Sequence, residues 1–123
     1  MTIAEEMTWT ADLTTLHGKI LPRSTALAPD QKTVVQVIGN PDAMRAVEVA
    51  GEITDEASAR QVAACMVMSV RLILPQWAGA NRWLTESLRA VKRKEQAITM
   101  QGWKLRMTWL PESNTVTLRA IWR

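Results

Sequence analysis

Residue types that commonly carry chemistry are scarce in this chain. Its 123 residues include one cysteine, Cys65, and one histidine, His17. An internal disulfide is therefore excluded, and these two side chains alone cannot build a metal cluster. Cys65 lies midway along an apolar segment, where we expect a small core residue. His17 lies in a poorly patterned segment, where we expect a surface or capping role, and we predict neither a metal site nor a catalytic residue.

Signals for nucleotide binding, secretion and membrane insertion are also absent. The five glycines match neither GxGxxG nor GxxxxGK[ST], so no phosphate-binding loop is predicted. The N-terminal MTIAEEMTW is acidic and lacks the basic start and apolar run of a secretory signal. The most apolar run, residues 62–74, contains Arg71 and is shorter than the roughly 20 residues that cross a bilayer. The lone cysteine favours a cytoplasmic location, and nothing indicates a cofactor, a membrane partner or a small-molecule substrate.

The residues that are present suit one soluble domain. Hydrophobic residues make up 47% of the chain and charged residues 22%, which argues against extensive disorder. The aromatic residues are all of one kind, with six Trp and neither Tyr nor Phe. Seven Met add flexible apolar bulk, which suits irregular packing or an adaptable interface. We expect a single hydrophobic core.

The stretch from Thr54 to Leu74 predicts the helix around which the fold is organised. Thr54 is a good N-cap, and Asp55 and Glu56 place negative charge at the positive end of the helix dipole. At helical spacing the apolar side chains gather on one broad face, and Pro75 ends the helix. The members of this face are Ala59, Val62, Ala63, Met66, Val70 and Ile73. A surface this wide needs a sheet to cover it.

A second helix is predicted from Asn81 to Lys94. Its apolar stripe consists of Leu84, Leu88 and Val91. Because only residues 75–80 separate it from the first helix, the two are expected to form an antiparallel αα-hairpin.

Two segments predict β-hairpins on either side of these helices. Residues 33–38 form a β-branched run, turn residues follow, and apolar and polar side chains alternate up to Ile53. A helix at residues 42–50 is the alternative there. The second hairpin lies within residues 96–123, where alternation and turn length both predict four apolar cross-strand pairs. These pairs are Trp109 with Val116, Met107 with Leu118, Leu105 with Ala120, and Trp103 with Trp122. Gly102 breaks the alternation, and we interpret it as a β-bulge.

Together these elements predict a two-layer α+β sandwich in the order ββααββ. An antiparallel four-stranded sheet made of two β-hairpins would pack on the αα-hairpin. We expect one domain over residues 33–123. Residues 1–32 are expected to form an N-terminal arm, or a short helix followed by a loop. Trp9, Leu13, Leu16 and Ile20 fall close to helical spacing, and His17-Gly18 is a possible C-terminal stop of that helix.

Charge is distributed unevenly along the chain. Residues 1–81 carry 6 basic and 9 acidic side chains, whereas residues 82–123 carry 9 basic and 3 acidic ones. In the predicted register Arg106 lies opposite Arg119, an unfavourable pair that a bound anion would relieve. Glu48 and Glu52 would neutralise the same face instead if the two hairpins lay side by side. The candidate anion or partner face comprises Lys104, Arg106, Arg119, Arg123, Arg89 and Arg93.

The sequence thus predicts a non-catalytic protein-interaction module, either self-associating or acting as a small subunit or adaptor of a larger assembly. Apolar residues on nominally polar faces, the abundant methionine and sheet edges that stay open all favour a protein partner. Binding of nucleic acid through the basic helix end and hairpin face is the alternative. Tryptophans on the opposite face from the basic residues do not match a base-stacking platform.

Overall fold

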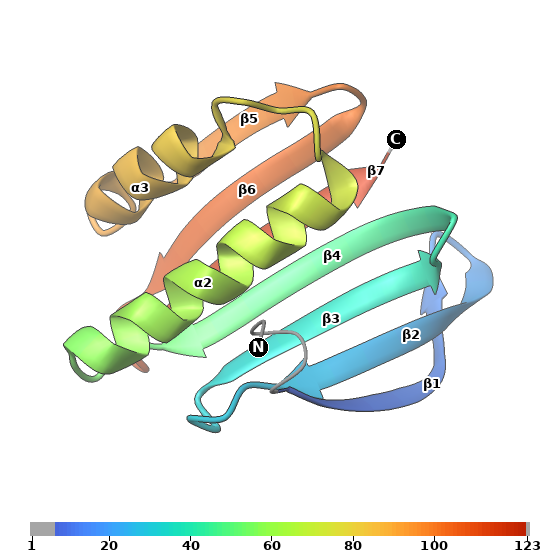
Figure 1. Cartoon of the computed structure of the whole chain (residues 1–123), viewed down its shortest axis with the longest axis horizontal. Helices are drawn as coiled ribbons and strands as arrows, with labels where there is room; N and C mark the ends of the chain where they lie inside the picture. Colours follow the sequence, from blue (N-terminus) through green and yellow to red (C-terminus); the bar gives the residue numbers. More distant parts are fainter. Residues whose placement is uncertain (1–6, 123) are drawn as a thin grey trace.

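The computed structural model of the chain describes residues 7–122, which form one antiparallel sheet with both helices on one of its faces (Figure 1). The sheet has seven strands in the spatial order β1-β2-β3-β4-β7-β6-β5. In chain order the elements are β1 (Thr8–Leu16), β2 (Lys19–Leu27), β3 (Thr33–Asn40), β4 (Ala43–Glu52), α2 (Glu56–Ile73), α3 (Ala80–Ala90), β5 (Gln96–Met100), β6 (Trp103–Leu110) and β7 (Thr115–Trp122). The predicted four-stranded sheet in the order ββααββ is therefore wrong.

Two of the additional strands come from the segment predicted as an arm or a short helix. Residues 8–27 form the β1–β2 hairpin instead, closed by a two-residue turn in which His17 and Gly18 both have positive φ, 51° and 77°. Such a turn matches the twist of a β-hairpin. The threonines of β1 alternate with apolar side chains, and this period of two outweighs the approximate helical spacing of Trp9 and Ile20.

The third additional strand is β5, and its turn explains the break at Gly102. Gln101 and Gly102 have φ values of 49° and 88°, and Met100 pairs directly with Trp103. The predicted β-bulge is therefore wrong: Gly102 is half of a two-residue hairpin turn. A turn and a bulge both interrupt the alternation at a glycine, so the pattern alone does not separate them.

The two predicted hairpins are present, and the helix considered at residues 42–50 is not. All four predicted pairs between β6 and β7 are confirmed, from Trp109 with Val116 to Trp103 with Trp122. The hairpins meet through β4 and β7, where Val49 pairs with Leu118. Both predicted helices also form, although α3 ends at Ala90, before the predicted Lys94.

The core lies between α2 and the middle of the sheet. One row of buried side chains crosses five neighbouring strands and consists of Ala26, Val35, Val49, Leu118 and Met107. From α2, Val62, Met66 and Val70 are buried against this layer. Gly51 lets the helix approach closely, since a Cβ atom there would collide with Val62. Close packing of this kind supplies most of the favourable free energy of folding.

Asp55, and not the predicted Thr54, is the N-cap of α2. Its Oδ1 accepts a hydrogen bond of 2.8 Å from the backbone N–H of Ser58, while the Ser58 hydroxyl oxygen accepts one of 3.0 Å from the Asp55 backbone N–H. This reciprocal arrangement is a capping box. The hydrogen bonds from Ser58 lower the pKa of Asp55 below its ordinary value.

The cap predicts how stability responds to acid. Because the pKa of Asp55 is lowered in the folded state, its contribution is complete above the unfolded value of about 3.9 and is lost as pH falls through the folded value. Asp55→Asn keeps a capping oxygen but cannot titrate, so its urea midpoint should fall less than that of the wild type between pH 5 and pH 2. Asp55→Ala should be less stable already at pH 7. If the urea midpoints of the wild type and Asp55→Asn fell equally between pH 5 and pH 2, Asp55 would not be the titrating cap.

Two glycines with similar backbone geometry allow a matched comparison. A Cβ atom on Gly102 would lie 2.5 Å from Cζ3 of Trp122, whereas one on Gly18 would meet nothing within 4 Å. Gly18→Ala should cost about 1–2 kcal/mol of unfolding free energy from its positive φ alone. Gly102→Ala should cost about 1–3 kcal/mol more, because the Trp122 ring must move. Urea unfolding followed by circular dichroism measures the unfolding free energy of both variants. Equal losses of unfolding free energy would show that the Trp122 ring does not restrict the side chain at position 102.

Candidate functional site

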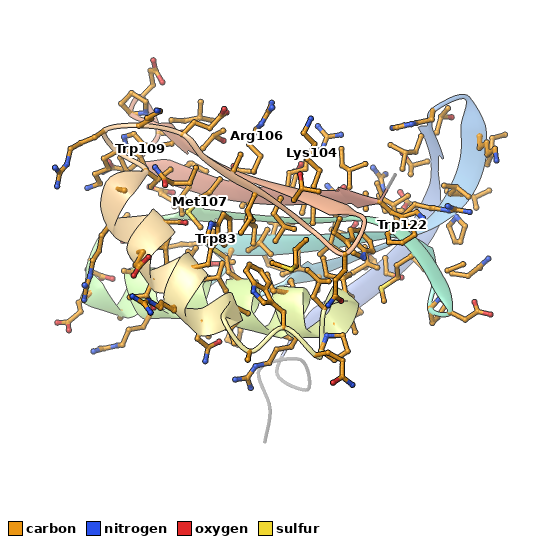
Figure 2. The ribbon with its side chains drawn as sticks, turned by 90° about the horizontal axis from the view of Figure 1, so that it is seen from above. Trp83, Lys104, Arg106, Met107, Trp109 and Trp122 are labelled. Carbon is orange, nitrogen blue, oxygen red and sulfur yellow. The ribbon has the colours of Figure 1, made fainter. Side chains whose placement is uncertain are left out.

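The basic side chains of the C-terminal hairpin project from the face of the sheet that carries no helix. Figure 2 shows Lys104 and Arg106 pointing away from the helices, on the opposite side of the sheet from Trp83. Arg119 lies directly opposite Arg106 in the register of β6 and β7, as predicted, and therefore shares this outer face. Lys104, Arg106 and Arg119 are here called the basic face.

Acidic side chains flank the two arginines. Glu95 Oε2 lies 3.7 Å from Arg106 Nε, and Glu48 Oε2 lies 3.9 Å from Arg119 Nε. The β4–β7 pairing brings Glu48 opposite Arg119, which is the side-by-side arrangement considered from the sequence, whereas Glu52 lies opposite Thr115. Both arginine side chains remain 54% exposed, so each ion pair is weak, but together they cancel much of the positive charge.

Two other predicted site residues, Arg89 and Arg93, do not join the basic face. Arg89 lies in the last turn of α3, and Arg93 follows in the turn that leads to β5. The helix layer covers the opposite face of the sheet, so the sheet separates Arg89 from Arg106 (Figures 1 and 2). Arg123 lies outside the described residues. The described members of the candidate set therefore do not form one surface.

A second basic cluster surrounds the end of α3. Lys92 Nζ lies 4.8 Å from the centre of the Trp109 ring, at a distance typical of a cation–π contact. Lys92, Arg93 and Lys94 border an open hollow of about 360 Å³ together with Trp109. This contact gives Trp109 a structural role and holds one of the three cations against the protein.

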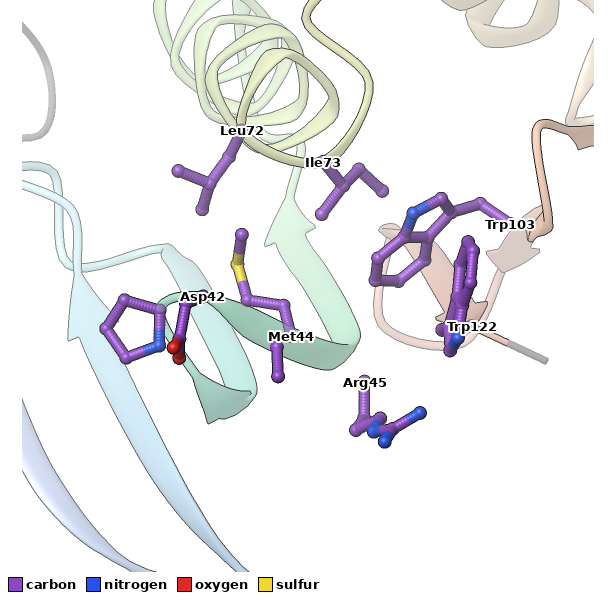
Figure 3. Close-up of a pocket in the computed structure, with 9 residues that line it drawn as sticks. Asp42, Met44, Arg45, Leu72, Ile73, Trp103 and Trp122 are labelled. Carbon is purple, nitrogen blue, oxygen red and sulfur yellow. The ribbon is translucent and has the colours of Figure 1, made fainter.

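A cleft lined by two tryptophans lies at the end of α2. Trp103 and Trp122 pack with ring centres 5.7 Å apart and ring planes tilted by 59°. Figure 3 shows Met44, Leu72 and Ile73 facing these rings across the opening. The cleft has a volume of about 370 Å³ and is polar at its rim, where Asp42 and Arg45 lie. We call it the tryptophan cleft.

The tryptophan cleft has the chemistry to accept an apolar side chain of a partner. Trp122 is 38% exposed and Leu72 is also exposed, so part of the apolar lining meets solvent. The sequence predicts the pairing of Trp103 with Trp122 but not the cleft. Met44 and Leu72 come from β4 and α2, and no local pattern places their side chains beside the end of β7.

Among the described residues, the large hydrophobic side chains with the highest exposed fractions lie on the β1–β2 hairpin. Leu13 is 67% exposed and Ile20 is 73% exposed. Leu13 pairs with Pro22, two residues from Ile20, so the three side chains share one face of the hairpin. Leu13, Ile20 and Pro22 are here called the apolar hairpin face. Helix α2 packs on β3 and β4, and in Figure 1 neither helix extends over β1.

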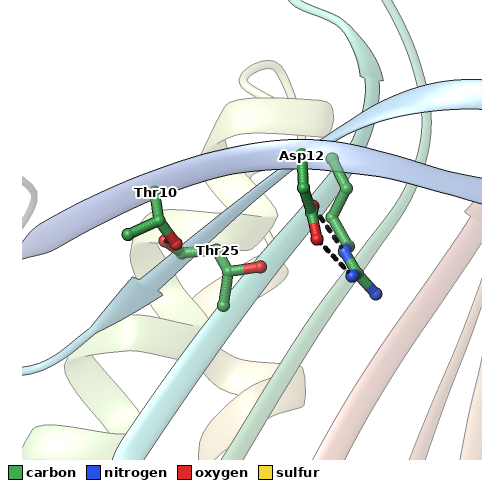
Figure 4. Close-up of polar contacts among 4 residues, drawn as sticks. Thr10, Asp12 and Thr25 are labelled. Carbon is green, nitrogen blue, oxygen red and sulfur yellow. Dashed lines mark hydrogen bonds and ion pairs between the residues drawn. The ribbon is translucent and has the colours of Figure 1, made fainter.

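The other face of the same hairpin carries a pair of charged side chains, together with Leu16 and Leu21, which line a hollow with Arg45 and Trp122. Figure 4 shows Arg23 and Asp12 joined by two hydrogen bonds, one of them from Arg23 Nε to Asp12 Oδ1 at 2.9 Å. The Thr10 hydroxyl donates to the backbone carbonyl of Thr25 at 3.4 Å. The hydrogen bond from Arg23 lowers the pKa of Asp12 below its ordinary value. These contacts help to fix the register of β1 on β2, on the face opposite the apolar hairpin face.

Strand β1 is also an outer edge of the sheet. Its sequence, TWTADLTTL, contains neither Lys nor Pro, two residue types that commonly protect edge strands from pairing with other chains. Its one charged residue, Asp12, is paired with Arg23 on its own hairpin. Among residues 7–122 no strand pairs with the outer side of β1, so this edge can accept a further strand.

The side chains that most often bind metals or act as nucleophiles are dispersed in the described part of the chain. Within residues 7–122, no group of three or more His, Cys, Asp or Glu side chains could hold a metal ion. His17 is exposed in the β1–β2 turn, and Cys65 is buried in α2 as predicted. Burial raises the pKa of the Cys65 thiol to about 11, which keeps it protonated at neutral pH.

Comparison with family models, characterised proteins and solved structures finds no match to this chain. None of the helices within residues 7–122 combines the length and the apolar character needed to cross a membrane. The surfaces described above are therefore the basis for assigning a function.

The state of Cys65 is directly testable. The thiol is buried and its pKa is raised to about 11. At pH 7.5 its reaction with a disulfide reagent should therefore be limited by the rate of the local unfolding that exposes Cys65. Addition of 6 M urea should expose one reactive thiol. Stoichiometric reaction within seconds in the absence of urea would show that Cys65 is accessible in the native state.

Proposed function

We propose that this chain is a non-catalytic protein-interaction module that self-associates or serves as a small subunit or adaptor of a larger assembly. The observation that carries the proposal is the apolar hairpin face, where Leu13 and Ile20 are mostly exposed beside an open edge strand. Complete burial of an aliphatic side chain of this size contributes about 1.5–3 kcal/mol. Covering this face therefore supplies a driving force for association.

The tryptophan cleft supports the same proposal. Trp122 and Leu72 add exposed apolar area next to the charged side chains Asp42 and Arg45, and protein interfaces are enriched in Trp, Met and Arg. An assembly can use the hairpin face and the cleft together. A cytoplasmic location is part of the proposal, because one buried thiol without a disulfide suits a reducing compartment.

Nucleic-acid binding is the second candidate, and the basic face favours it. Arg106 and Arg119 oppose each other, and a phosphate placed between them would relieve their repulsion. Glu48 and Glu95 provide part of that relief without a ligand. Trp103 and Trp109 lie on the helix side of the sheet, so they offer no stacking surface to bases held on the basic face.

Size-exclusion chromatography with light scattering separates the two candidates. The protein should form a dimer or larger species whose mass is the same at about 0.05 M and 0.3 M salt, because apolar burial is not screened. A mixed-sequence oligonucleotide should not alter its elution. Arg119→Glu should leave this assembly and the circular dichroism spectrum unchanged.

The opposite pattern would favour nucleic acid. A monomer that co-elutes with the oligonucleotide at low salt and releases it at higher salt would contradict the interaction proposal. Arg119→Glu should then weaken the binding, whereas Arg60→Glu, at an exposed position on α2, serves as a charge-matched control.

A further inference from the structure

The end of the β1–β2 hairpin projects beyond its neighbour in the sheet. Strand β2 pairs with β3 only through residues 23–27, so its first residues, Lys19–Pro22, pair with β1 alone. The facing part of β1 runs from Leu13 to Leu16. A two-stranded ribbon is at best marginally stable in water, and three or more strands with an apolar face are needed. Within residues 7–122 this part of the ribbon has no third strand on either side, neither beside β1 nor beside Lys19–Pro22 of β2.

A second β1 strand can occupy that side with two-fold symmetry. A two-fold axis normal to the sheet relates two identical antiparallel strands and keeps each side chain on its own face. Directly opposed residues of an antiparallel pair also share a face, so the residue at the axis must lie opposite its own copy. An axis at Asp12 would set the two Asp12 carboxylates opposite each other, which is unfavourable. An axis at Ala11 would leave Thr15 and Leu16, at the projecting end, unpaired.

An axis at Leu13 avoids opposed carboxylates and also pairs the projecting end of β1. It pairs residues 10–16 of one copy with residues 16–10 of the other and so extends the ribbon to its end. The most exposed apolar side chain of β1 then meets its own copy, and the row across the junction reads Pro22, Leu13, Leu13, Pro22. On the other face Asp12 lies opposite Thr14 of the second copy, where its carboxylate can accept from the threonine hydroxyl. The bond between Asp12 and Arg23 is unaffected.

The directions of the backbone N–H and C=O groups of β1 are compatible with this pairing. A two-residue turn is flanked by a hydrogen-bonded pair, and hydrogen-bonded and non-hydrogen-bonded pairs alternate along an antiparallel ladder. Counted from Leu16 and Lys19, the even-numbered residues of β1 direct their backbone groups toward β2, and the odd-numbered ones direct theirs outward. Ala11, Leu13 and Thr15 therefore present donors and acceptors to the second copy.

From these observations we propose that β1 pairs with β1 of a second copy of this chain, antiparallel and centred on Leu13. The two sheets join into one continuous sheet, and the apolar hairpin faces of both copies meet at the junction. This inference rests on the proposed interaction function and names the partner and the register.

Cysteine cross-linking tests the register in the full chain, since the buried Cys65 stays unreactive. Leu13→Cys should form a disulfide-linked dimer under mild oxidation, because directly opposed residues lie within the Cα separation that a disulfide spans. Ala11→Cys and Thr15→Cys should each fail alone, because in this register equal residues are about 13 Å apart along the strands. An equal mixture of these two variants should cross-link as a heterodimer.

A charge at the axis provides a second readout that does not require a disulfide. Leu13→Lys should raise the dimer dissociation constant at least about tenfold, because two ammonium groups meet at the axis. Leu110→Lys, at another exposed leucine far from β1, is the matched control and should leave it unchanged. Circular dichroism checks that both variants fold.

The outcomes separate this inference from the broader proposal. Cross-linking of Ala11→Cys alone, or a salt-insensitive assembly that tolerates Leu13→Lys, would overturn the Leu13 register while the interaction function stands. A monomer at every concentration, with no cross-link in any variant, would overturn both.

Discussion

Packing of α2 against the paired strands β4 and β7 is the constraint on which the rest of the structure depends. The helix approaches the sheet closely at Gly51, where Val62 occupies the space that a larger residue would take. Val49 and Leu118, from strands far apart in the chain, lie side by side in the buried row beneath the helix. Without this layer the N-terminal four strands and the C-terminal three would share no core.

The same constraint determines what remains exposed. The two helices gather over the centre and the β5 side of a seven-stranded sheet, so within residues 7–122 neither helix extends over β1 and neither covers the outer face. On the outer face, ion pairs such as Arg119 with Glu48 balance the exposed charge. On the hairpin, apolar side chains such as Leu13 have no comparable compensation in the described part of the chain. Exposure of apolar groups without a balancing contact is what distinguishes the proposed interaction surface.

Sequence patterns predicted the elements whose evidence is local and failed where a single turn decided the outcome. The β6–β7 register followed from alternation and turn length together, which also placed Arg106 opposite Arg119. The β1–β2 hairpin was missed because its turn begins at His17. This residue is not glycine, yet it adopts a left-handed backbone conformation that composition does not signal. Arg89 lies in the helix layer and not beside Arg106, because neighbours in sequence can lie in different layers. The tryptophan cleft depends on side chains from four elements, β4, α2, β6 and β7, which no single periodicity connects.

The pairing of β4 with β7 also has a consequence for the order of events during synthesis. The two strands are separated in the chain by both helices and by β5 and β6, so their contacts close a long loop and are expected to form late. A chain emerging from the ribosome can complete the β1–β4 meander while the inner edge of β4, with Val47 and Val49, still lacks its neighbour. For that interval the strand that will become the centre of the sheet is itself an edge, and the nascent chain is most vulnerable to aggregation there.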